Sequence, residues 1–84
     1  METPRKYTSD DISAILDALS DEEEFGVILR AKGFVDGKDG TWIYFDYVPG
    51  EKNIRTGEPA VTGRFCVIGS HMKEDRLKEL FNIE

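Results

Sequence analysis

Residues 26–48 read GVILRAKGFVDGKDGTWIYFDYV, and the conformation of the first ten of them decides the fold. A helix over 26–35 would have to run past Gly26 and Gly33, and each glycine inside a helix costs about 1 kcal/mol relative to alanine. A strand over 26–35 places both glycines at or near its ends. We therefore predict a strand here.

A helical alternative exists for the same segment. Ser20 and Glu23 have the spacing of a capping box, which marks the start of many helices. A helix opened by this box would carry three apolar side chains on its inner face, namely Phe25, Ile28 and Leu29.

The second half of the quoted stretch completes a hairpin. Residues 37–40 (GKDG) tolerate positive φ, and residues 41–48 (TWIYFDYV) are β-branched and aromatic, which is typical of a strand. Strict alternation along 41–48 places Ile43, Phe45 and Tyr47 in the core. Trp42 and Tyr44 then share the opposite face and should be partly exposed there, as a candidate contact surface.

Alternation along 26–35 divides that strand into two faces as well. One face carries Val27, Leu29, Ala31, Gly33 and Val35, and the other carries Ile28, Arg30, Lys32 and Phe34.

The remaining elements follow from capping signals and hydrophobic periodicity. Thr8–Asp11 supplies cap oxygens and early acids for a helix over 10–20, with an inner face of Ile12, Ile15, Leu16 and Leu19. Residues 61–68 predict a strand in which Arg64, Cys66 and Ile68 alternate with Phe65 and Val67. A last helix should start at Gly69-Ser70, with Met72, Leu77, Leu80 and Phe81 inward. Short strands are also expected at 53–55 and near 5–8.

These elements predict an α+β fold. Short connections favour antiparallel neighbours, and two amphipathic helices need one sheet face to bury their apolar stripes. We expect a two-layer sandwich of ferredoxin-like character, with a mainly antiparallel sheet of four to five strands and two helices packed on one face. At 84 residues the chain should form a single domain.

Composition excludes several classes of protein. The net charge is −6, and residues 1–24 alone hold eight acids against two bases, which argues against a nucleic-acid partner. The apolar runs are too short for a membrane span, and the amino terminus lacks the apolar segment of a secretory signal. A single cysteine cannot form an internal disulfide and suits a cytoplasmic location.

Two binding motifs begin in the quoted stretch, but neither is completed. Three residues separate Gly33 from Gly37 where a phosphate loop needs four, and Asp39 follows Lys38 where the loop needs a hydroxyl. Residues 32–34 (KGF) match the start of an RNA-recognition strand signature, and the residues that follow depart from it.

Cys66 and His71 are the only soft metal ligands, and they are weak candidates because a closed zinc site needs four. We expect a buried structural cysteine and a surface histidine instead. No nucleophile–base pair has a readable spacing, so we expect neither catalysis nor a cofactor.

The quoted stretch also resembles a known family. The segment 27–35 (VILRAKGFV), a short gap, then Trp42 with its strand, and later residues 64–69 (RFCVIG) are similar to the carboxy-terminal domain of the CobW family. The likeness covers about residues 7–83. Members of this family join such a domain to an amino-terminal P-loop GTPase domain and are implicated in zinc or cobalt delivery or in cobalamin synthesis. The GTPase domain, its phosphate loop and its C-x-C-C metal motif lie outside this sequence.

The resemblance implies a non-catalytic accessory domain of a GTP-dependent metallochaperone. Its expected partners are its own GTPase domain and a metalloprotein client, and the expected contact residues are Arg30, Lys32, Trp42 and Tyr44. The alternative is a stand-alone small-ligand-binding or regulatory domain, and an RNA-binding module is less favoured.

Overall fold

The computed structural model describes residues 1–83. In chain order its elements are β1 (Glu2–Thr3), β2 (Lys6–Tyr7), α1 (Ser9–Ala18), α2 (Glu22–Phe25), β3 (Val27–Gly37), β4 (Trp42–Val48), β5 (Glu51–Gly57), β6 (Gly63–Ser70) and α3 (Glu74–Leu80). β3 confirms the extended conformation expected for residues 26–35. The α+β class is confirmed with it.

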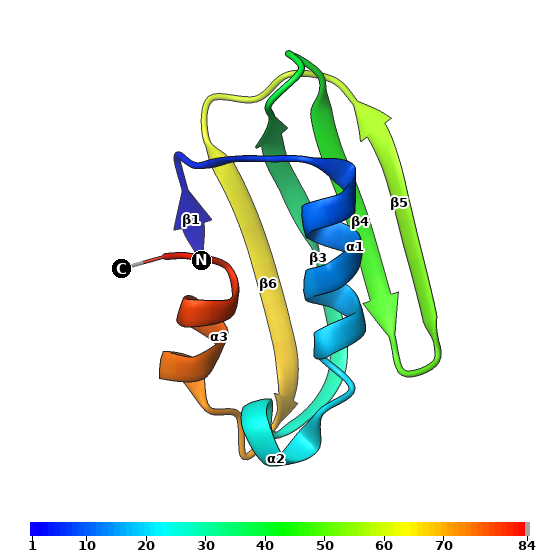
Figure 1. The fold of residues 1–84 in the computed structure, drawn as a ribbon, viewed down its shortest axis with the longest axis vertical. Helices are drawn as coiled ribbons and strands as arrows, with labels where there is room; N and C mark the ends of the chain where they lie inside the picture. The colour runs from blue at the N-terminus through cyan, green and yellow to red at the C-terminus, as the bar shows by residue number, and fades with distance from the viewer. Residues whose placement is uncertain (84) are drawn as a thin grey trace.

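β3 is the central strand of a sheet whose order is β1-β6-β3-β4-β5 (Figure 1). It pairs antiparallel with β4 on one side and β6 on the other, and β2 pairs parallel with its last residues. Because β3, β4 and β5 follow one another as a meander and β6 returns beside β3, the four long strands form a Greek key. The sheet is mainly antiparallel, as expected, and β2 is its parallel exception.

The helices lie on one face of the sheet and leave the other face open. α1 crosses over β4 and β5, while α3 lies near β6 and the N-terminal strand (Figure 1). Side chains from both layers form one core, and each fully buried large apolar side chain contributes about 1.5–3 kcal/mol. The expected inner face of α1 is confirmed, because Ile12, Ile15, Leu16 and Leu19 are all buried. Of the inner face expected for the last helix, Leu77 and Phe81 are buried, Leu80 is only partly buried, and Met72 lies before α3 and is also only partly buried.

β3 contains a bulge that changes which face Ile28 occupies. Its pairing with β6 shifts register between Ile28 and Arg30. Ile28 is therefore buried with Ala31 and Val35, and the prediction that it shares a face with Arg30 is wrong. Leu29, expected beside Ala31, is instead exposed.

One turn of the alternative helix is present before β3. This turn, α2, is capped by Asp21, whose carboxylate accepts a hydrogen bond from the backbone N–H of Glu24 at 3.2 Å. Gly26 ends the turn with a φ of 88°, a conformation that favours glycine. The chain can therefore pass directly from α2 into β3.

The last helix begins at Glu74, so the expected start at Gly69-Ser70 is wrong. Both of those residues belong to β6, where Gly69 pairs with Ile28 and Ser70 pairs with Val27. The strand continues because β3 is long enough to give these residues partners, and the chain then leaves the sheet through residues 71–73.

The first seven residues are fixed to the sheet and to the C-terminal end of α3. β1 pairs with β6, and β2 provides the strand expected near residues 5–8. The hydroxyl of Tyr7 donates a hydrogen bond to the backbone carbonyl of Phe81 at 2.5 Å, and both residues are buried. The segment therefore holds the two ends of the fold together.

Removing the Tyr7 hydroxyl tests this connection. Tyr7→Phe keeps the ring but leaves the buried Phe81 carbonyl without this donor, so we expect a loss of about 1–3 kcal/mol in the free energy of unfolding. Urea unfolding measures the change. A Tyr7→Phe protein as stable as the wild type would contradict the role given to this hydrogen bond.

The cap of α1 makes the stability depend on pH. The hydrogen bond from the backbone N–H of Thr8, at 2.9 Å, and the Thr8 hydroxyl lower the pKa of Asp11 below its ordinary value of 3.8. The stabilisation is therefore complete above that value and is lost as the pH falls through the lowered pKa. We expect Asp11→Asn to destabilise the protein at pH 6, by about 1 kcal/mol. The unfolding free energies of the two proteins should begin to approach each other near pH 3.8 and converge only below the lowered pKa of Asp11, and a difference independent of pH would contradict this account.

Candidate functional site

The open face of the sheet, defined as the face without helices, carries its side chains in rows set by the strand register. One row contains Arg55, Tyr44, Phe34 and Arg64, which are successive Cα partners across β5, β4, β3 and β6. The Phe34 and Tyr44 rings lie 5.3 Å apart between centroids. Two aromatic rings thus occupy the middle of a row that has an arginine at each end.

The next row places polar groups beside those rings. It contains Asn53, Asp46, Lys32 and Cys66, again as successive partners. Lys32 therefore stands on the central strand between an acid and the only thiol of the chain.

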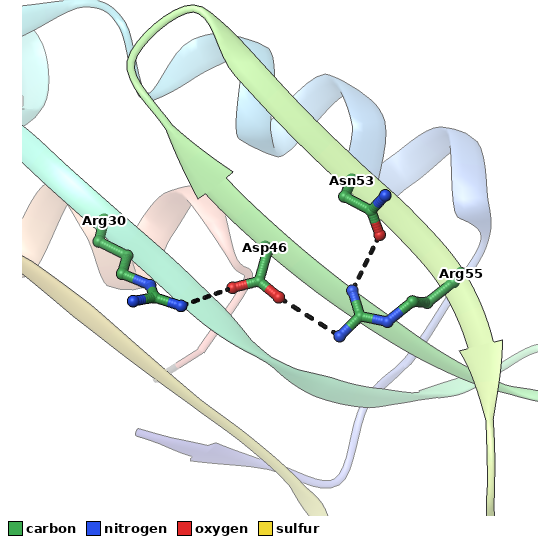
Figure 2. Close-up of polar contacts among 4 residues, drawn as sticks. All are labelled: Arg30, Asp46, Asn53 and Arg55. Atoms are coloured by element: carbon green, nitrogen blue, oxygen red, sulfur yellow. Dashed lines mark hydrogen bonds and ion pairs between the residues drawn. The ribbon is translucent and has the colours of Figure 1, made fainter.

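Asp46 joins two arginines in this region. Its Oδ1 lies 3.4 Å from Arg30 Nη2 and its Oδ2 lies 3.3 Å from Arg55 Nη2, and Arg55 Nη1 donates to Asn53 Oδ1 at 2.9 Å (Figure 2). The carboxylate holds both guanidinium groups over the sheet. One negative charge is thus shared by two positive charges, with Lys32 as a third close by.

The two rows line a hollow of about 560 Å³. Its lining comes from β1, β6, β3, β4 and β5, and the rings of Phe34 and Tyr44 contribute to it. The Tyr44 ring is fixed in two ways. Its hydroxyl donates to the backbone carbonyl of Glu58 at 2.9 Å, and the ring occupies the space that a Cβ at Gly57 would fill.

Three of the four residues expected to form the contact surface meet here. Arg30, Lys32 and Tyr44 all line the hollow. Trp42 does not, and the expectation that it is partly exposed is wrong, since only 8% of its surface is accessible. Its ring lies 6.3 Å from that of Phe34, so Trp42 lies beside the half-buried ring pair of Phe34 and Tyr44, outside the lining of the hollow.

Other lining residues were not identified from the sequence. Phe34 and Arg64 were assigned to predicted strands but not to a site. Alternation along those strands nevertheless places both side chains on the same sheet face as Lys32. Arg55 carried no signal, because the strand expected at 53–55 gave no indication that β5 extends over seven residues and pairs fully with β4.

Of the two weak metal-ligand candidates, His71 lies in the expected setting and Cys66 does not. Cys66 is exposed on the open face, and the expectation of a buried cysteine is wrong because alternation along β6 sends Phe65 rather than Cys66 into the core. His71 is exposed, as expected, in the turn after β6. Within residues 1–83, no three histidine, cysteine, aspartate or glutamate side chains are grouped as a metal site requires.

Among the helices in residues 1–83, none combines the length and the apolar character needed to cross a membrane.

Comparison with known proteins gives one match. The family model described as "Cobalamin synthesis protein cobW C-terminal domain" matches residues 1–83. No curated protein and no solved structure gives a significant match.

The arginines of the open face should contribute little to stability. Their ion pairs with Asp46 are long and exposed, so we expect Arg30→Met and Arg55→Met each to change the free energy of unfolding by less than about 1 kcal/mol. Phe45→Ala, in the core, is the matched positive control and should cost about 3–5 kcal/mol. Losses above about 2 kcal/mol for the arginine variants would identify these residues as structural supports.

Proposed function

Because the chain belongs to the family of CobW C-terminal domains, we propose that it is a non-catalytic accessory domain of a GTP-dependent metallochaperone. It docks on the GTPase domain of its parent protein or on a metalloprotein client, for zinc or cobalt delivery or for cobalamin synthesis. The observation that carries this proposal is the open face of the sheet, where an aromatic pair and several cations are left without a covering layer.

The residues of the open face have the chemistry of a protein contact surface. Aromatic and arginine side chains are enriched among the residues that contribute most to protein interfaces. We assign Arg30, Lys32 and Tyr44 to direct contact with the partner. Trp42 is buried and supports the ring of Phe34 from the side.

For the bound nucleotide to control docking, the contact between the open face and the GTPase domain must differ between the GTP-bound and GDP-bound states. A ligand shifts an equilibrium only through its different affinity for the two states. In this proposal, GTP and GDP change the surface that the GTPase domain presents, and the open face binds one form more tightly.

The exposed thiol of Cys66 suits a reducing compartment, and we assign the protein to the cytoplasm on that ground.

Calorimetric titration with a CobW-type GTPase domain from the same organism tests the proposal. The domain is loaded with GDP in one series and with a non-hydrolysable GTP analogue in the other. We expect a difference in Kd of at least about fivefold, the lower end of typical coupling between sites. Equal affinities in both states, or no binding in either, would overturn the proposed coupling.

Charge-reversal variants locate the contact in the same experiment. Arg30→Glu combined with Lys32→Glu should weaken binding at least tenfold. Lys38→Glu, which makes the same kind of change in the exposed 37–40 turn, is the control and should bind like the wild type. If Lys38→Glu alone weakens binding, the contact lies at that end of the molecule instead.

A further inference from the structure

Charge is divided between the two faces of the molecule. Residues 9–24, which include α1 and most of α2, hold seven acids and no base. The lining of the hollow has the opposite balance, with two acids, Asp46 and Glu2, against four bases, namely Arg30, Lys32, Arg55 and Arg64. A chain of net charge −6 thus gathers positive charge on its open face.

The bases in the hollow keep hydrogen-bond donors for a ligand. Arg30 and Arg55 share the single carboxylate of Asp46, and both side chains are about half exposed. Lys32 makes no ion pair with any of the described residues. Exposed ion pairs of this kind are weak, and an arginine has five N–H donors, so added carboxylates can bind without displacing a strong interaction.

The bases on the helical side are engaged differently. Lys52 of β5 turns to α1, where its Nζ lies 2.7 Å from Asp17 Oδ1 and 2.7 Å from Ser13 Oγ. Arg76 of α3 pairs with Glu24 and Glu79. Lys52 and Arg76 are therefore already paired with acids of the helical side, whereas Lys32 in the hollow makes no ion pair within residues 1–83.

The apolar part of the hollow is prepared for contact. Phe34 and Tyr44 are half-buried, and Tyr44 is held by its hydrogen bond to Glu58 and by its fit over Gly57. A ring that is already fixed loses little conformational entropy when a ligand packs against it.

The extent of the hollow indicates the shape of the ligand. Its lining spans five strands, and a spacing of about 4.8 Å between strands makes it about 19 Å across. An extended peptide advances about 3.3 Å per residue, so about six residues cross it. A surface this broad suits a segment of chain better than a compact metabolite.

We propose that the open face binds an extended acidic segment of a protein partner, about six residues long. Carboxylates of the segment pair with Lys32 and with the outward donors of Arg30 and Arg55, and an apolar side chain at its centre packs on the ring pair of Phe34 and Tyr44. The inference deepens the proposed docking role by naming the chemistry of the docked segment, and it rests on that role for the identity of the partner.

A protein segment fits these charges better than a nucleic acid does. A polynucleotide brings a phosphate with every residue, fixed in its backbone, and therefore meets the acids on the same face, Glu2, Asp36 and Asp46. The carboxylates of a peptide stand on flexible side chains, so they can turn toward the bases and away from Asp46.

Fluorescence of Trp42, the only tryptophan, provides the test, because its ring lies 6.3 Å from that of Phe34, which lines the hollow. The probe is the peptide DEFDED with blocked ends, which has no tryptophan of its own. We expect saturable binding that weakens at least tenfold when the salt concentration rises from 0.02 M to 0.5 M. Lys32→Glu and Arg55→Glu should each weaken binding at least fivefold, and Lys38→Glu should leave it unchanged.

Control ligands decide between the chemical classes. The neutral peptide NQFNQN and the ring-free peptide DEADED should each bind at least fivefold more weakly than DEFDED. Equal binding of NQFNQN, tighter binding of oligothymidylate, or equal binding of free citrate would overturn the acidic-segment inference. Sedimentation that shows the chain pairing with itself through this face would overturn it as well.

Amide chemical shifts recorded in the same titration detect binding even if the fluorescence of Trp42 does not change. Shifts at Lys32, Tyr44 and Arg55 support the inference, and shifts confined to α1 contradict it. The peptide test does not involve the GTPase domain. Peptide binding without GTPase binding therefore leaves the acidic-segment inference standing and removes the proposed docking on the GTPase domain. GTPase binding without peptide binding removes the acidic-segment inference and leaves that docking standing.

Discussion

The position of β3 between β4 and β6 is the constraint on which the rest of the structure depends. β3 donates and accepts ladder hydrogen bonds on both sides, and its faces separate the core from the open surface. Gly33 permits the close approach of β6, because a Cβ there would lie 2.4 Å from the Cβ of Phe65 and 2.3 Å from the carbonyl oxygen of Arg64. Phe65 in turn stacks on Phe81 of the C-terminal segment at 4.1 Å, so one missing side chain lets strand pairing and helix packing occur together.

The same alternation explains why binding groups gather on the other face. Each inward residue of β3, β4 and β6 is matched by an outward neighbour, and the outward set contains Arg30, Lys32, Phe34, Tyr44, Asp46 and Arg64. Both longer helices lie on the inner side, which leaves this set uncovered (Figure 1). Ion pairs through Asp46 order the arginines without burying them (Figure 2). The surface is therefore shaped by the core but contributes little to its stability, which is the condition for a site that is free to bind.

The sequence was largely sufficient to predict which segments form strands and which side chains of β4 point into the core. Features that depend on contacts between residues distant in the sequence could not be predicted. The strand predicted over 26–35 is present as β3, although Gly33 lies in its interior rather than near its end. The alternation of Ile43, Phe45 and Tyr47 predicted the inner face of β4 correctly. The bulge that turns Ile28 inward arises from pairing with β6, which lies about forty residues later in the sequence. The local sequence around Ile28 therefore does not predict it. Trp42 is buried by its tertiary neighbours, and the length of β5 is set by its partner β4, so neither follows from propensity alone.

Alkylation of Cys66 measures the central claim most directly, because this exposed thiol is the only one in the chain and lies in the lining of the hollow. The rate of its reaction with iodoacetamide is compared for the free chain and for the chain saturated with the GTPase domain. Covering of the open face predicts at least a tenfold slower reaction in the complex and full reactivity after denaturation. An unchanged rate in a complex shown to be saturated would contradict the account, since the partner would then occupy another surface.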